Sequence, residues 1–177
     1  MDNVRIRSAV VDNAKRIAQI HCASWRDAYA NVLDPVFLAG PIEQDRRTVW
    51  EERLSFPTQK QVVLVAETPR AELAAFLCLY LDRDARWGSL IDNLHVAPDL
   101  RGRRIGEQLM RVSAETVCSS AANGSLYLWV LEDNQAGRRF YERLGGQVVE
   151  RSVSEFPAAN RAPNLRMFWP DSSILHR

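Results

Sequence analysis

The sequence predicts a mixed α/β domain in which helices cover a central, mostly antiparallel sheet. Three features of the chain predict it. Apolar runs of strand length alternate with segments whose apolar residues recur every three or four positions. Three strand-like runs follow one another with only short turns between them, as in an antiparallel meander. Helix-stopping glycines and prolines separate these segments.

Length and composition fit one soluble domain. The chain has 177 residues, of which 46% are hydrophobic and 25% charged, so we expect a single domain over residues 1–177. A formal net charge of +1 gives no global field for nucleic acid or an acidic membrane. No stretch approaches the ~20 apolar residues of a membrane span, and Met1–Ser8 lacks the apolar part of a signal peptide. We expect a cytoplasmic protein.

The three cysteines, Cys22, Cys78 and Cys118, lie far apart and form no CxxC pair. This spacing predicts neither a disulfide framework nor a metal site. Cys78 and Cys118 stand among apolar residues, so we expect them to be small core side chains.

The first third of the chain predicts one strand and three helices. Val4–Val10 alternates like a strand. Asp12 or Asn13 can cap the next helix. A second helix begins at Asp34-Pro35, and a polar third helix spans Glu43–Leu54. In the first helix, the residues at helical spacing are Ile17, Ile20, Ser24 and Ala28.

The rest of the chain predicts a meander followed by alternating elements. The meander strands are Gln61–Glu67, Leu73–Leu81 and Ser89–Ala97. The later elements are a helix at Gly106–Ser119, a strand at Leu126–Leu131, a helix at Gln135–Leu144, and strands at Gln147–Ser154 and Leu165–Trp169.

The junction between the third meander strand and the next helix predicts an anion site. A helix N-terminus offers unpaired N–H groups and a partial positive charge. Glycine lets the backbone approach phosphate oxygens, and guanidinium groups suit phosphate. The junction therefore predicts a diphosphate cradle made of Arg101, Gly102, Arg103, Arg104, Ile105 and Gly106. The GxxxxGK[ST] and GxGxxG patterns are absent, and on this motif alone a capped helix with a solvated basic turn remains an equal alternative.

This loop resembles the acetyl-CoA signature of the GCN5-related N-acetyltransferases (GNAT superfamily), (Arg/Gln)-x-x-Gly-x-(Gly/Ala). Arg101 opens it, Gly106 closes it, and Arg104 replaces the usual middle glycine. Residues 126–146, LYLWVLEDNQAGRRFYERLGG, resemble the family's later motif of strand, asparagine, tyrosine-bearing helix and Gly-Gly end. The resemblance covers most of the chain from Val62 onward. It implies the GNAT fold, with six to seven strands and four to five helices.

Asn134 and Tyr141 are the chemically useful residues of the later motif. Asn134 can cap the helix, and Tyr141 lies nearly two turns further on the same side. Gly137 leaves a gap on that face against which a ligand can lie. The resemblance makes Tyr141 the general acid that protonates the leaving thiolate. A tyrosine that only packs the helix is the alternative.

The resemblance also implies that the strand Ser89–Ala97 splays from its neighbour. The main-chain groups of Leu94, His95 and Val96 would then bind the acetyl and pantetheine arm. An amide N–H of this segment would polarise the thioester carbonyl.

The attacking amine must lose a proton, so the site needs a base. Asp92, on the acetyl-binding strand, is the first candidate, and Glu67 and Glu132, at strand ends, are alternatives. His95 has an ordinary pKa of about 6.5, but packing or hydrogen bonding is its favoured role.

The early helices are expected to build the acceptor site. Trp25 and Tyr29 are four residues apart and share a helix face. Arg26 of the same helix and Trp50 of the third helix add to this aromatic and charged group. Packing of the helices against one another is an equally open explanation for these side chains.

Together these features predict an acetyl-CoA-dependent N-acetyltransferase that acetylates a primary amine by direct transfer in a ternary complex, with no metal. The alternative is a non-catalytic acyl-CoA-binding sensor or interaction module. Three arginines in one turn are too small a footprint for a nucleic-acid protein. The resemblance also implies that the sheet can pair in a homodimer through its C-terminal strand.

Overall fold

The computed structural model describes residues 4–176; residues 1–3 and 177, which the single-domain prediction includes, lie outside the described part. Its helices are α1 (Ala14–Ala28), α2 (Pro35–Ala39), α3 (Ile42–Ser55), α4 (Ile105–Ser120) and α5 (Gln135–Arg143). Its strands are β1 (Arg5–Ser8), β2 (Gln61–Glu67), β3 (Leu73–Asp84), β4 (Gly88–Val96), β5 (Leu126–Leu131), β6 (Gln147–Val153) and β7 (Pro163–Trp169).

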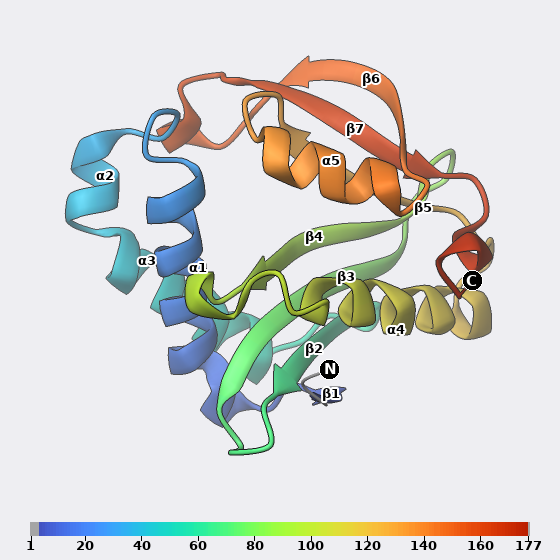
Figure 1. Ribbon diagram of the computed structural model, residues 1–177, viewed down its shortest axis with the longest axis horizontal. Coiled ribbons are helices and arrows are strands. Elements are labelled where there is room, and N and C mark those ends of the chain that lie inside the picture. Colours follow the sequence, from blue (N-terminus) through green and yellow to red (C-terminus); the bar gives the residue numbers. More distant parts are fainter. Residues whose placement is uncertain (1–3, 177) are drawn as a thin grey trace.

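The strands form one open sheet in the order β1-β2-β3-β4-β5-β7-β6 (Figure 1). Every neighbouring pair is antiparallel except β4 and β5, which are parallel. The predicted mixed, mostly antiparallel sheet with flanking helices is therefore confirmed. No helix within residues 4–176 is long and apolar enough to cross a membrane.

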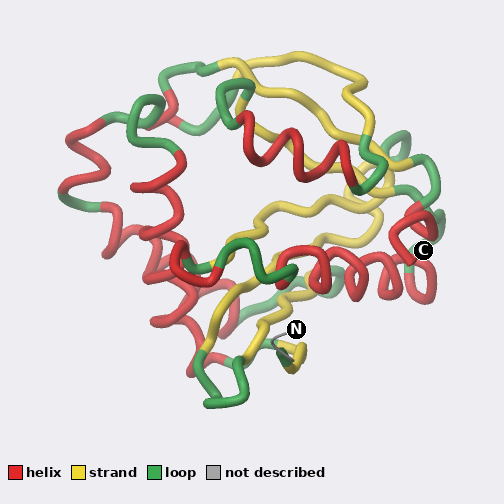
Figure 2. Tube along the Cα trace, viewed as in Figure 1, coloured by secondary structure: helices red, strands yellow, loops and turns green. Residues whose placement is uncertain are grey.

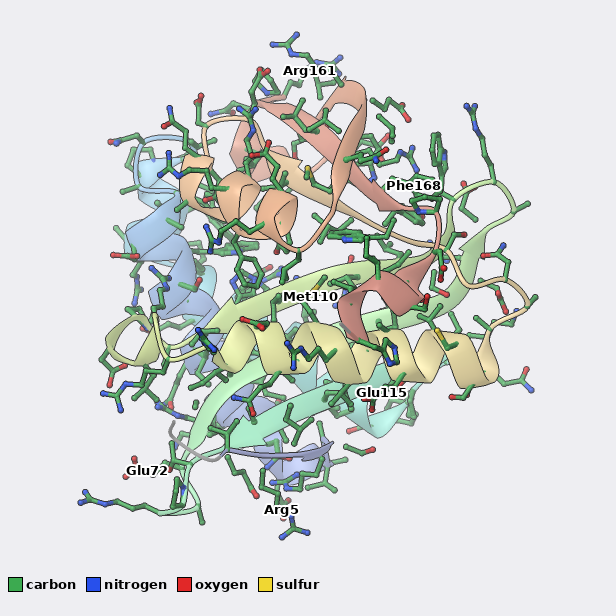
Figure 3. The ribbon with its side chains drawn as sticks, turned by 45° about the vertical axis from the view of Figure 1, so that its right-hand side comes forward. Arg5, Glu72, Met110, Glu115, Arg161 and Phe168 are labelled. Atoms are coloured by element: carbon green, nitrogen blue, oxygen red, sulfur yellow. The ribbon has the colours of Figure 1, made fainter. Side chains whose placement is uncertain are left out.

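Helices cover both faces of the sheet (Figure 2). Successive residues of a strand point to opposite faces. Leu77 therefore packs in the cluster that contains Leu109 and Met110 of α4, while Phe76 packs with Ile17 of α1 and residues of α3. α4 itself is amphipathic, because Met110 is fully buried toward the sheet (labelled in Figure 3) and the opposite side of the helix faces solvent. α5 adds side chains to the same cluster as α4.

The element boundaries agree closely with the sequence, but two local predictions are wrong. Asn13 does not cap α1: its Oδ1 accepts from the Val10 amide at 3.0 Å and from Arg7, so it braces the chain that precedes the helix. Cys118 is exposed, because the buried stripe of α4 passes through Val117 and leaves the next residue outside. The predicted helix start at Asp34-Pro35 is confirmed, since Asp34 caps α2 and its Oδ1 accepts from the Val36 amide at 2.7 Å.

The position of β7 corrects the expected mode of dimerisation. β7 is the C-terminal strand, but it lies between β5 and β6 and pairs with both of them. Neither of its edges is left to pair with another chain. The sheet edge on that side is β6, whose seven residues are all exposed.

Candidate active site

The two halves of the sheet separate between β4 and β5. These strands pair over only three residues each, with Ile91 opposite Leu128 as the last pair (Figure 1). Asp92 follows directly and is the extra residue of a β-bulge, because Cys78 of β3 pairs with Asn93 and Leu79 pairs with Ile91. A bulge bends its strand. β4 thus stays paired with β3 while its other edge turns away from β5.

A cleft of about 1420 Å³ lies at this separation. Nearly all of the residues predicted for donor and acceptor binding line it. They are Trp25, Tyr29, Asp92, Leu94, His95, Val96, Arg101, Gly102, Arg104, Ile105, Gly106, Asn134, Gly137 and Tyr141. Arg103, Glu67 and Glu132 are not among the lining residues. The chain thus brings its two motifs, from separate sheet halves, to one cavity.

The loop before α4 needs left-handed backbone at two positions. Gly102 has φ 77° and Arg104 has φ 60°. Glycine takes this conformation without strain, whereas arginine does not. Arg104 is therefore strained at the position where the resembling signature has glycine. At Gly106 a Cβ would lie 3.3 Å from Phe140 and 3.6 Å from Val96, so this glycine lets α4 begin close to both α5 and β4.

The Arg101 side chain turns toward α1. Its guanidinium forms an ion pair with Asp27 and donates to Ser24 Oγ at 3.2 Å. The Ser24 hydroxyl also shares a hydrogen bond of 2.9 Å with His95 Nδ1. One network therefore joins the loop, α1 and β4. These contacts of Ser24 and Asp27 could not be predicted from helical spacing, because the partners lie more than seventy residues away along the chain.

His95 is held as a neutral ring. Burial, together with the charges of Arg101 and Arg46, lowers the pKa of His95 to about 3. Its ring stacks on His21 at 4.5 Å. His21 Nδ1 accepts from Trp50 Nε1 at 3.1 Å, so the neutral His21 ring carries its proton on Nε2. His95 is consequently a weak proton acceptor, and its contacts match the favoured packing and hydrogen-bonding role.

The carboxylate candidates for the base differ in position. Asp92 lines the cleft, and one of its oxygens accepts from Arg53 Nη1 at 2.7 Å. The Glu67 carboxylate, at the C-terminal end of β2, pairs with Arg7 at 2.5 Å. Glu132 pairs with Arg151 at 2.7 Å. Of these three carboxylates, Asp92 alone borders the cavity.

Asn134 connects α5 with α1. Its Oδ1 accepts from the Gly137 amide at 2.9 Å, as the cap prediction requires. Its Nδ2 donates to Tyr29 Oη at 3.2 Å. Gly137 lines the cleft, but a Cβ there would lie 2.7 Å from Asn134 Nδ2, so the Asn134 side chain occupies the space beside it. Gly137 makes room for the Asn134 side chain.

Tyr141 lies at the inner wall of the cleft. Its ring packs edge-on against Trp169 at 6.1 Å and against Phe140 at 5.1 Å. Burial, with Tyr29 nearby, raises the pKa of Tyr141 above its ordinary value of 10. The phenol therefore keeps its proton at neutral pH and can donate it.

Aromatic side chains and arginines build the end of the cleft next to α1 and α3. The Trp25 ring packs against Phe156 at 5.1 Å, and the Arg46 guanidinium lies 4.9 Å from the centre of the Trp25 ring. Trp50 is fully buried against His21 and does not line the cleft. Sequence reasoning missed Arg46 and Phe156, which come from a polar helix and from the loop after β6.

Comparisons with known proteins agree with this architecture. The model of the acetyltransferase (GNAT) family matches residues 16–146. The chain is 23% identical to the uncharacterized N-acetyltransferase YuaI of Bacillus subtilis (strain 168), covering 97% of this chain and 96% of YuaI.

Two solved structures share the fold. The PaiA N-acetyltransferase of Thermoplasma acidophilum, in complex with coenzyme A, superposes with a TM-score of 0.74 at 16% identity, covering 94% of this chain and 98% of PaiA. YncA of Salmonella typhimurium, with acetyl-CoA, gives 0.65 at 16% identity, covering 94% and 93%. With the family model matching most of its length, the chain belongs to the acetyltransferase (GNAT) family.

Proposed function

We propose that the protein is an acetyl-CoA-dependent N-acetyltransferase that transfers the acetyl group directly to a primary amine in a ternary complex. One observation carries the proposal: a single cleft joins the loop 101–106, the open edge of β4 and the half-buried Tyr141. Family membership supports the donor, as do the coenzyme A of PaiA and the acetyl-CoA of YncA.

The donor would lie along the opening between β4 and β5. The amides at the start of α4 and the flexible backbone at Gly102 suit its diphosphate. The unpaired edge of β4 at Leu94–Val96 can hydrogen-bond the pantetheine arm as a neighbouring strand would. An N–H of this edge would polarise the thioester carbonyl.

Transfer needs one bond to form and one to break. The neutral amine attacks the thioester carbon, a C–N bond forms and the C–S bond breaks. Tyr141, whose phenol is protonated at neutral pH, gives its proton to the departing sulfur. The proton that the amine loses passes through Asp92 or water, and it ultimately restores the phenol.

Replacing Tyr141 with phenylalanine tests this assignment. Tyr141→Phe should lower kcat by ~10²–10⁴ while acetyl-CoA affinity changes little, because only the acid is removed. Free thiol release over a panel of amines gives the rate, and calorimetry gives the affinity. The control is Tyr127→Phe, which alters a phenol outside the cleft. Equal turnover of both variants would remove Tyr141 from the mechanism.

The same assay separates an enzyme from a sensor. A non-catalytic acyl-CoA-binding module would bind acetyl-CoA and release no thiol with any amine. An enzyme releases thiol only when an accepted amine is present, and the acetylated amine appears in equal amount.

A further inference from the structure

One face of α3 brings two guanidinium groups to the acceptor end of the cleft. Arg46, Val49 and Arg53 all line the cavity, and their spacing of three and four residues places them along one side of the helix. Leu33 and Ala159 line the same end from other segments. The side chains of α3 therefore help to decide which acceptor fits.

The two arginines differ in how they are neutralised. Arg53 binds Asp92, which itself lines the cleft. Arg46 binds Asp45, which is not among the lining residues, and both Nε (2.7 Å) and Nη2 (2.5 Å) contact the same oxygen of Asp45. Among residues 4–176, Nη1 of Arg46 makes no hydrogen bond. Arg46 thus keeps donor capacity toward the cavity.

Arg46 is also fixed and largely removed from water. Only 13% of its side chain is exposed. Its guanidinium lies 4.9 Å from the ring centre of Trp25 and 5.8 Å from that of Phe156. A cation in such a place interacts more strongly with an opposite charge than an exposed one does. Its charge also reaches His95 on β4, where the thioester is expected to bind.

Three of the five carboxylates that line the cleft are already paired with arginines, which reduces their capacity to recognise a polycation. Asp27 is paired with Arg101, Asp92 with Arg53, and Glu107 with Arg111 at 3.0 Å. The other two lining carboxylates, Asp133 and Glu155, are exposed. Arg46 is likewise paired with Asp45, but Asp45 lies outside the cleft lining and Nη1 of Arg46 is left to bind an anion there.

We propose that the acceptor is an amine that also carries an anionic group, in the simplest case a carboxylate, and that Arg46 binds this group beside Trp25. The amine end then points toward Leu94–Val96 of β4. This inference rests on the proposed acetyl transfer, and it names the class of acceptor. Polyamines and other polycations are poor acceptors.

Matched amines test the inference by rate. Phenylalanine is compared with phenethylamine, methionine with 3-(methylthio)propylamine, and spermidine serves as the polycation, all at equal concentrations of neutral amine. The carboxylated member of each pair should show kcat/KM at least ~10-fold higher, as a charge-assisted hydrogen bond supplies. Arg46→Met should abolish this preference. The control Arg47→Met, on the exposed side of α3 where Arg47 pairs with Glu51, should retain it.

A binding measurement tests the inference without turnover. N-acetylphenylalanine and N-acetylphenethylamine, the two products, are titrated into the protein saturated with coenzyme A. The acid should bind at least ~10-fold tighter to the wild type and to Arg47→Met, but not to Arg46→Met. Equal affinities, no binding of the acid, or a preference for spermidine in the rate assay would overturn the inference. A failure of acetyl transfer shows itself separately, as no thiol release from any amine.

Discussion

Arg104 has a backbone conformation that glycine adopts without strain. Its φ of 60° lies in the left-handed region, which costs an L-residue roughly 1–2 kcal/mol. The same position holds glycine in the signature that the loop resembles. The departure visible in the sequence is thus a local strain in the structure, placed at the start of α4.

Arg104→Gly should therefore raise the free energy of unfolding by about 1 kcal/mol, or the Tm by about 2–4 °C, because glycine relieves the strain. Thermal and urea unfolding measure it. The control is Arg103→Gly, at a neighbouring position without positive φ, which should not stabilise the protein. Equal destabilisation by both variants would show that the strain at Arg104 is negligible.

The two stacked histidines predict a pH dependence of stability. The folded pKa of His95 is about 3 and that of His21 is also well below the ordinary 6.5, so the unfolded chain binds protons that the folded chain refuses. The contribution of these neutral histidines to the free energy of unfolding is complete above pH 6.5. It is lost as the pH drops toward 3, by up to about 1.4 kcal/mol per pH unit for each histidine.

Unfolding in urea between pH 6.5 and 4.5 measures this slope. His95→Asn should flatten it, while the control His176→Asn, at an exposed position, should leave it unchanged. A slope that is the same in wild type and His95→Asn would contradict a neutral, buried His95.

Single residues were easier to predict than their partners. The chemistry of Asn134 and Tyr141 follows from side-chain type and helical spacing, and both line the cleft. The bond from Asn134 to Tyr29 spans 105 residues, and nothing in a single sequence indicates such a contact. The side chain that lies beside Gly137, that of Asn134, was likewise not visible in the spacing of the sequence.

Elements were predicted more fully than their irregularities. The bounds of β2 and β5 agree with the apolar runs, because those runs are buried and end at turn residues. The bulge at Asp92 could not be predicted from the sequence pattern, because it depends on how the residues of β4 pair with those of β3. The resemblance, rather than the residues, anticipated the parting of β4 from β5.

The contact between the loop 101–106 and α1 leads to a prediction about acetyl-CoA binding. The Arg101–Asp27 pair holds the loop onto α1, so Asp27→Asn should loosen the loop and weaken acetyl-CoA binding a few-fold, as an exposed ion pair worth under ~1 kcal/mol allows. Calorimetry at low and high salt measures the effect, which should shrink as salt screens the pair. If Arg101 instead served mainly as a phosphate ligand, its release from Asp27 would tighten binding.

The molecule as a whole is a sheet whose halves meet at a weak join. β4 and β5 share only three residue pairs, whereas β3 and β4 pair along most of their length. α5 and the first turn of α4 approach each other across the join, where Gly106 lies against Phe140. A ligand in the cleft touches both halves, so its binding energy adds directly to the cohesion of the fold.

Acetyl-CoA should consequently stabilise the protein most strongly along this join. At a concentration of 100 times Kd it adds about 2.7 kcal/mol, or roughly 5–10 °C in Tm for a domain of this size. Hydrogen exchange should slow most at the amides of residues 92–96, which border the cleft on the unpaired edge of β4. Amides of the exposed edge strand β6 exchange by local opening and should change little. A uniform slowing throughout the sheet, without excess at residues 92–96, would mean that the donor does not lie along β4.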